Sequence, residues 1–156
     1  MELYLVRHAE AVSEQEDPRC PLSDRGREAV SRMAGFIRGL NINVKVIKHS
    51  KKLRAEQTAR ELARAVTSAD GLQATEGLTP NDDVRPMKTL LEDAQENVMI
   101  VGHLPYLSRL VSCLLDAGRE QKTVAFGACC VVRMDYNEAS GEWGIRWVLT
   151  PDIVKS

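Results

Sequence analysis

The segment LYLVRHAE at residues 3–10 constrains the chain most, because an apolar run ends there abruptly in an arginine, a histidine and a carboxylate. Residues 2–6 are bulky or β-branched, which predicts a strand buried on both faces, as in a parallel sheet. Arg7 and His8 follow where this strand leaves the core. Open α/β sheets bind ligands outside the carboxyl ends of their strands. The segment therefore predicts a sheet and a ligand site at its edge.

Strand and helix patterns alternate along most of the chain. Short apolar runs predict further strands at 44–47, more weakly at 72–78, and at 98–101. Apolar residues at helical spacing predict helices between them, the first with Ser23 as its N-cap and an end near Gly39. The other helices are expected from Arg54 to 66, over 87–94, and from Pro105 in the first turn to 115. Such alternation is typical of βα units with right-handed crossovers and a mostly parallel sheet.

The C-terminal part has a different pattern. Residues 128–134 and 143–149 resemble two strands, and the turn composition of 137–141 predicts that they form an antiparallel hairpin. With 156 residues and no repeat or linker, we expect a single domain over residues 1–156. The expected fold class is α/β, a three-layer α/β/α sandwich whose mostly parallel central sheet is extended by this hairpin.

Composition excludes several classes of function. A formal net charge of -1 gives no general attraction to nucleic acid or to an anionic membrane, so any anion site must be local. With 4% aromatic residues there is no stacking platform for single-stranded nucleic acid. No apolar run approaches the length of a membrane span, and the N-terminus lacks the regions of a signal peptide, so we expect a cytoplasmic protein without a membrane partner. The oligomeric state is left open.

The cysteines lack the spacing of a metal site, and we expect them to be free thiols. Cys129 and Cys130 are adjacent in a predicted strand, so their side chains should point to opposite faces of the sheet. This placement disfavours a disulfide or a shared metal, and it favours a role in filling the core.

Polar groups far apart in the sequence fall at the ends of the predicted strands: Arg7 with His8, Arg54, the turn at 79–83, and His103. In a parallel sheet these ends share one edge, which predicts a single cleft holding two arginines and two histidines. Two converging guanidinium groups repel each other unless an anion lies between them. A tetrahedral phosphoryl group fits, because the planar fork of arginine can bind its oxygens in pairs.

Histidine chemistry suits such a cleft. A histidine can attack phosphorus if one ring nitrogen is unprotonated and the other N–H is held by a carbonyl or carboxylate. A second histidine can stabilise the charge on the equatorial oxygens, either as a neutral donor or as an imidazolium. His103 precedes a predicted helix, so backbone N–H groups near Leu104 and Tyr106 can add to the anion site, and Ser13 can donate from the first loop.

Three motifs together resemble the histidine phosphatase superfamily, formerly called phosphoglycerate mutase-like. They are RHA at 7–9, Ser50 with LRAEQT at 53–58, and GHLP at 102–105. The short chain and the LTP turn at 78–80 look most like the SixA-type phosphohistidine phosphatase branch, and the resemblance covers essentially the whole chain. Two positions depart from the common pattern, since Ala9 stands where glycine is usual and Lys51 where many relatives have proline.

The resemblance implies a mechanism for these residues. His8 would be the nucleophile that becomes phosphorylated, and Arg7, Arg54 and His103 would bind the transferring phosphoryl group. Water would then hydrolyse the phosphohistidine intermediate, and neither a metal nor another cofactor is implied. The expected substrate is phosphohistidine in a phosphorylated histidine-containing protein.

The general acid is left open between Glu10 and Asp82, with Asp83 as a further candidate. Weak assistance by an acid favours hydrolysis of a phosphoramidate over an unactivated ester, because a protonated imidazole leaves phosphorus more easily than an alkoxide does. The main alternative is a metal-free phosphatase of small phosphorylated molecules that uses the same four residues. A phosphoprotein-binding module without catalysis is a third hypothesis, and the intact His8 argues against it.

Overall fold

The computed structural model of the protein describes residues 1–116 and 123–155. A six-stranded sheet, in the order β5-β3-β6-β1-β7-β8, forms its centre. In chain order the elements are β1 (Glu2–Arg7), α1 (Asp24–Arg38), β2 (Asn43–Val44), β3 (Val46–His49), α2 (Leu53–Leu62), β4 (Thr67–Ser68), β5 (Leu72–Ala74), α3 (Arg85–Ala94), β6 (Val98–Gly102), α4 (Tyr106–Leu114), β7 (Val131–Asn137), β8 (Glu142–Leu149) and a short 3-10 helix, η1 (Pro151–Ile153).

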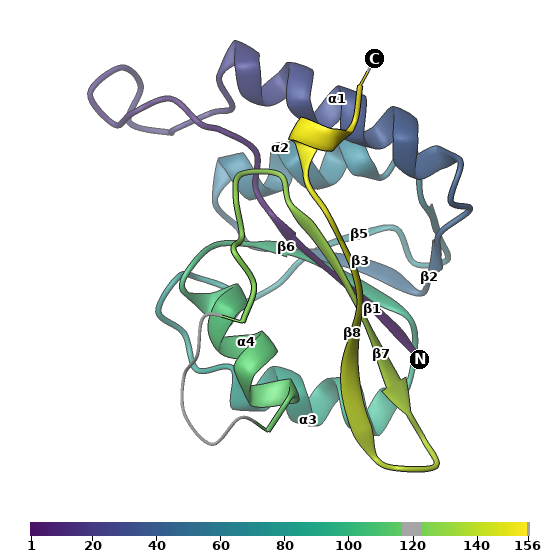
Figure 1. Ribbon diagram of the computed structural model, residues 1–156. Helices are drawn as coiled ribbons and strands as arrows, with labels where there is room; N and C mark the ends of the chain where they lie inside the picture. The colour runs from purple at the N-terminus through teal and green to yellow at the C-terminus, as the bar shows by residue number, and fades with distance from the viewer. Residues whose placement is uncertain (117–122, 156) are drawn as a thin grey trace.

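The sheet is parallel from β5 to β1 and antiparallel where the C-terminal strands join it. Helices α1 and α2 cover one face of the sheet, and α3 and α4 cover the other (Figure 1). The predicted three-layer α/β/α sandwich with a mostly parallel sheet and a C-terminal hairpin is therefore confirmed. None of the helices in the described residues is both long and apolar enough to cross a membrane.

Strand β1 lies between β6 and β7 and is buried on both faces, as its continuous apolar sequence predicts. Tyr4 and Val6 belong to the core on the side of α1 and α2, whereas Leu3 and Leu5 belong to the core on the side of α3 and α4. The alternation of side chains along a strand explains this division. Because β1 lies between β6 and β7, its end and the polar segment that follows lie at the middle of the sheet edge.

The two adjacent cysteines are also divided between the two faces. Cys129 lies in the core beside α1 and α2, and Cys130 lies in the core beside α3 and α4. Both are free thiols, and burial raises the pKa of Cys129 to about 12 and that of Cys130 to about 11. They fill the core as the sequence predicts, and their raised pKa values keep them as unreactive thiols.

Helix α1 is anchored to the loop that follows β1. The Ser23 hydroxyl accepts a hydrogen bond from the Gly26 N–H (3.0 Å) as the predicted N-cap, and the helix ends at Gly39. The backbone oxygen of Glu10 accepts the Ser23 N–H (2.9 Å) and lies only 2.0 Å from where a Cβ on Gly26 would be. Glycine is required for this close approach, which fixes the loop after His8 against the helix.

Several predicted boundaries are wrong. The single strand predicted at 44–47 is two strands, β2 and β3, which belong to different sheets, because the Lys45 N–H between them donates to the Asn97 carbonyl (2.7 Å). Strand β5 stops at residue 74, and the two-residue β4 has no sequence pattern of its own. Helix α4 begins one residue after Pro105, which is its N-cap. Strand β7 begins at residue 131 because Cys129 has a left-handed backbone, with φ of 60°.

Candidate active site

The ends of three neighbouring strands bring most of the predicted site residues together. Strands β3, β6 and β1 are adjacent and parallel, with Arg7 opposite Gly102 and His49 opposite Val101. The residues that follow these strands therefore share one edge of the sheet, and α2 and α4 begin at the same edge (Figure 1). The shared edge is the arrangement from which the sequence predicts a single cleft, and that cleft stays a prediction.

His8 is held as a neutral ring with one unprotonated nitrogen. Its Nδ1 lies 2.8 Å from the Ala9 carbonyl oxygen, which can only accept, so Nδ1 carries the proton and Nε2 has a free lone pair. The pKa of His8 is lowered to about 4, mainly by burial and also by the nearby guanidinium groups of Arg54 and Arg7, against the opposing effect of the Ala9 hydrogen bond. Near neutral pH the ring is therefore neutral, with a lone pair on Nε2.

Two guanidinium groups of the site have no carboxylate partner within residues 1–116 and 123–155. Arg7 donates from Nη1 to the Phe126 carbonyl oxygen (2.7 Å), and its Nε is buried with no hydrogen-bond partner among the described residues. The Arg54 side chain, from the first turn of α2, forms neither an ion pair nor a hydrogen bond within residues 1–116 and 123–155. Both arginines lower the pKa values of His8 and His103. An anion is the ligand that such a site would stabilise.

His103 is the fourth residue of the predicted site, beside Arg7, His8 and Arg54. Its side chain is nearly inaccessible, with 2% exposed, and its ring centroid lies 5.1 Å from that of His8. Burial, His8 and the nearby positive side chains lower the pKa of His103 to about 3, so the ring is neutral near pH 7. The neutral state agrees with one of the two roles that the sequence predicts for this residue, a neutral hydrogen-bond donor. Its Nε2 lies 2.8 Å from the Ser50 hydroxyl.

Thr58 makes contacts beside the site to which the sequence analysis assigned no role. Its buried hydroxyl accepts the Ala9 N–H (3.0 Å) and donates to the Arg54 carbonyl oxygen (2.8 Å). It thereby ties the backbone after His8 to the first turn of α2, which carries Arg54. The sequence carries two signals for Thr58: it closes the LRAEQT motif at 53–58, and it follows Arg54 by four residues, the spacing at which a threonine can hydrogen-bond back along a helix.

The carboxylates predicted as candidate general acids are all engaged elsewhere. Glu10 is exposed, and its Oε1 accepts from the Ser23 hydroxyl (2.9 Å). Asp82 accepts from both the N–H (2.8 Å) and the hydroxyl (2.6 Å) of Thr79, which lowers its pKa. The hydrogen bonds from Arg85 lower the pKa of Asp83 to about 2. An acid needs a pKa near the working pH, so these lowered values argue against Asp82 and Asp83 as proton donors.

Ser13 and Leu104 are the other residues predicted to bind phosphate. The exposed Ser13 hydroxyl accepts the Glu16 N–H (3.2 Å) and so stabilises its own loop. Leu104 is half-buried directly after His103, and among the described residues its backbone N–H has no hydrogen-bond acceptor. That N–H stays a candidate donor to a bound anion, as predicted for the start of α4.

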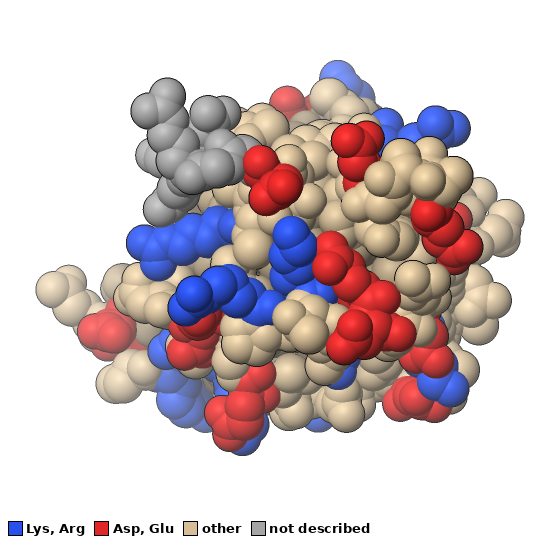
Figure 2. All heavy atoms as spheres, turned by 90° about the horizontal axis from the view of Figure 1, so that it is seen from below, with Lys and Arg blue, Asp and Glu red and all other residues tan. Residues whose placement is uncertain are grey.

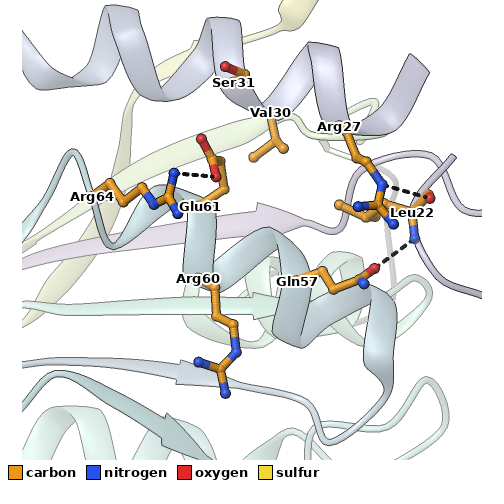
Figure 3. A pocket seen from close by; sticks show the side chains of 8 residues that line it. All are labelled: Leu22, Arg27, Val30, Ser31, Gln57, Arg60, Glu61 and Arg64. Carbon is orange, nitrogen blue, oxygen red and sulfur yellow. Dashed lines mark hydrogen bonds and ion pairs between the residues drawn. The ribbon is translucent and has the colours of Figure 1, made fainter. Parts of the chain in front are cut away.

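A separate hollow of about 360 Å³ lies between α1 and α2 and contains none of the predicted site residues (Figure 3). Two of its arginines are neutralised by glutamates of their own helical segment, Arg60 by Glu56 (2.8 Å) and Arg64 by Glu61 (3.6 Å). Its lining consists of Leu22, Arg27, Val30, Ser31, Gln57, Arg60, Glu61 and Arg64. This lining contains no histidine, in contrast to the strand-end site.

Charges of both signs cover the side of the molecule formed by α3 and α4 (Figure 2). The basic side chains gather toward the end to which β1 and β6 run, and the acidic ones lie mostly on the other part of this face. Charges of both signs nevertheless occur over the whole of this face, in line with the net charge of -1.

Comparisons with known proteins give the family and the fold. Residues 3–79 match the histidine phosphatase superfamily (branch 1). The chain is 26% identical to the phosphohistidine phosphatase SixA of Escherichia coli (strain K12), over 99% of this chain and 97% of that protein. It is 31% identical to an uncharacterized protein of Picosynechococcus sp., over 81% and 74% of the two chains. The fold is that of the protein histidine phosphatase SixA solved in complex with tungstate, with a TM-score of 0.83, 24% identity, and coverage of 99% and 100% of the two chains.

Proposed function

Because the chain belongs to the histidine phosphatase superfamily, we propose that it is a phosphohistidine phosphatase whose nucleophile is His8. One observation carries the proposal. The His8 ring is neutral, its Nδ1 proton is held by the Ala9 carbonyl, and its free Nε2 lies close to two arginines that have no carboxylate partner in the part of the chain that the structure describes. Relatives named as phosphohistidine phosphatases support the choice of substrate class. We further propose that the reaction takes place in the cytoplasm and requires no metal.

In the first step, the Nε2 lone pair of His8 attacks phosphorus and the P–N bond of the substrate breaks. If the other ring nitrogen of the substrate is already protonated, the leaving imidazole departs as a neutral ring and takes no proton from the enzyme. Arg7, Arg54 and His103 bind the three equatorial oxygens, where charge concentrates in the transition state. Positioning and charge stabilisation therefore suffice for this transfer.

In the second step, water attacks the phosphorus and the P–Nε2 bond of His8 breaks. The products are dihydrogen phosphate, which releases a proton to solvent, and the original neutral imidazole. Nδ1 keeps its proton throughout, because the Ala9 carbonyl holds it at 2.8 Å. The nucleophile is thus regenerated in the form that starts the next cycle.

The test of the proposed function is phosphate release from a phosphorylated histidine-containing domain, compared with a panel of sugar and nucleotide phosphates. An alkoxide leaving group needs a proton donor, and a positioned acid contributes about 10²- to 10⁴-fold to a rate. Since Glu10, Asp82 and Asp83 are engaged elsewhere, we expect kcat/KM for the phosphorylated domain to exceed that for the esters by about this factor. Turnover of the esters alone would make the chain a small-molecule phosphatase, and binding without phosphate release would make it a phosphoprotein-binding module.

The protonation of His8 gives a second prediction. A neutral ring is the nucleophile, and the ring takes up a proton and loses its Nε2 lone pair as the pH falls through its pKa. We expect His8 to titrate with a pKa of about 4, so that it stays neutral down to about pH 5. Because phosphohistidine is acid-labile, the measurement is ¹⁵N NMR of the substrate-free protein with labelled histidine. A His8 pKa near the ordinary 6.5 would contradict the burial and charge effects that act on it.

A further inference from the structure

The hydroxyl of Ser50 contacts the histidine that faces His8. Ser50 directly follows β3 and is fully buried, and its N–H donates to the Val101 carbonyl oxygen of β6 (3.1 Å). This bond fixes Ser50 beside the strand that leads into His103. Its Oγ lies 2.8 Å from Nε2 of His103 and also accepts the Lys52 N–H (3.3 Å).

These contacts decide which atom donates. The Ser50 hydroxyl has one proton, and the Lys52 N–H already points at its oxygen. Within the described residues, Nε2 of His103 is the acceptor found for that proton. A buried hydroxyl that donated to nothing would lose a hydrogen bond, so Ser50 donates and Nε2 accepts. In the neutral ring of His103, the proton then resides on Nδ1.

Nδ1 of His103 is buried and has no hydrogen-bond partner among the described residues. A buried N–H without an acceptor is rare, and such atoms in a cleft indicate a missing ligand. The His8 and His103 rings are 5.1 Å apart, so a phosphoryl group on His8 would lie within reach of the second ring. An N–H at Nδ1 attracts an equatorial phosphoryl oxygen, whereas a lone pair there would repel it.

We propose that Ser50 is a positioning residue, which holds His103 in the Nδ1–H form so that this ring donates a neutral hydrogen bond to the phosphoryl group on His8. The expected effect on kcat rests on the proposed function, whereas the expected tautomer of His103 does not. Ser50 itself does not touch the phosphoryl group; it acts through the ring of His103. The arginines then supply the positive charge of the site, and His103 supplies a directed donor.

The spectroscopic test uses ¹⁵N-labelled histidine, whose two ring nitrogens have different chemical shifts when protonated and when bare. His103 of the unaltered protein should show a protonated Nδ1 and a bare Nε2 near pH 7. In Ser50→Ala the donor to Nε2 is lost, and the Nε2–H form should become populated, whereas Ser50→Thr should keep the original pattern. An Nε2–H form in the unaltered protein, or an unchanged tautomer in Ser50→Ala, would overturn the proposal.

The kinetic test compares the same variants on the phosphorylated histidine-containing domain. Loss of a residue that orients a functional histidine typically costs about 10- to 100-fold, so we expect kcat of Ser50→Ala to fall by about that factor with KM changed less than about twofold. Ser50→Thr should recover most of the activity. The control is Ser112→Ala, which removes another buried serine hydroxyl, in α4, and should keep kcat. Equal kcat values for Ser50→Ala and the unaltered protein would overturn the proposal.

These two readouts separate the inference from the proposed function. If the unaltered protein releases no phosphate from phosphohistidine, the proposed function fails, while the tautomer of His103 is still read from the spectrum. If the unaltered protein is active and Ser50→Ala keeps both its tautomer and its rate, the function stands and the inference fails. Far-UV circular dichroism and the melting temperature of each variant show whether it is folded as the unaltered protein is.

Discussion

With His8 replaced by alanine, the protein should take up no phosphate from a phosphodonor, and its turnover should fall by at least about 10⁴-fold. The reason is that, among the described residues of the site, His8 has an unprotonated Nε2 that no hydrogen bond occupies, whereas the bare Nε2 of His103 accepts from Ser50. Arg7 and Arg54, which we propose bind the phosphoryl group, lie near this nitrogen. In the unaltered protein, we expect phosphate that is labile in acid and stable in alkali, carried by the peptide that contains His8. This bound phosphate is measured after brief incubation with a radiolabelled phosphodonor and a quench in alkali.

His49 offers a matched control for this experiment. It is another buried histidine at the end of a parallel strand, and its Nδ1 is 2.9 Å from the carbonyl oxygen of the next residue, just as Nδ1 of His8 is 2.8 Å from that of Ala9. His49 belongs to none of the three sequence motifs, which favours a structural or rim role, and among the described residues its hydrogen bond goes to the Ser50 carbonyl and not to an arginine of the site. His49→Asn should therefore label as the unaltered protein does. Undiminished labelling and turnover in His8→Ala would refute the assignment of the nucleophile.

The architecture follows from local sequence patterns, because each pattern has a single physical reading. The uninterrupted apolar run of β1 fits only a strand with both faces covered, and Ser23 and Gly39 mark the ends of α1. The boundary between β2 and β3 is different. It depends on the hydrogen bond from Lys45 to Asn97, a residue more than fifty positions away, and a run of four apolar or basic residues carries no trace of it.

The residues of the site also fall into two groups, those that the order of strands brings together and those whose contacts it does not determine. Arg7, His8 and His103 lie at strand ends, and the order of strands in the sheet is enough to bring them together. The functions of Ser50 and Thr58 depend on side-chain contacts that the order of strands does not determine. Ser50 belongs to one of the three motifs, but only its 2.8 Å contact with His103 indicates what it does there. Such contacts between segments cannot be predicted from one sequence.

The carboxylates show where residue type alone misleads. Glu10 follows the nucleophile by two residues, and Asp82 lies in a turn beside the predicted cleft, so both have plausible positions for a general acid. In the structure, Asp82 binds the backbone and hydroxyl of Thr79, and Glu10 binds the N-cap of α1. Acidic residues near loops and helix starts often stabilise those elements, and their sequence positions are the same in either role.

Replacement of Arg54 by methionine should lower kcat/KM for the phosphorylated histidine-containing domain by about 10²- to 10³-fold, the usual loss when a preorganised donor to a transition-state oxygen is removed. Methionine keeps a long side chain in the first turn of α2, and the Thr58 hydroxyl still reaches the backbone carbonyl of residue 54. Arg54→Lys should recover part of the loss, because lysine keeps the charge but not the planar fork that binds two oxygens. Steady-state phosphate release gives kcat/KM for the unaltered protein, Arg54→Met and Arg54→Lys.

A second readout shows whether the loss comes from the charge at this position. The Arg54 guanidinium lowers the pKa of His8, so this pKa should rise in Arg54→Met and remain low in Arg54→Lys. Arg60→Met is the control from the same helix, since Arg60 is exposed and paired with Glu56 at 2.8 Å. It should keep kcat/KM within about twofold, as surface ion pairs contribute little. A similarly small effect of Arg54→Met would mean that the phosphoryl group is bound without Arg54, and the anion site would then have to be built from Arg7 and His103 alone.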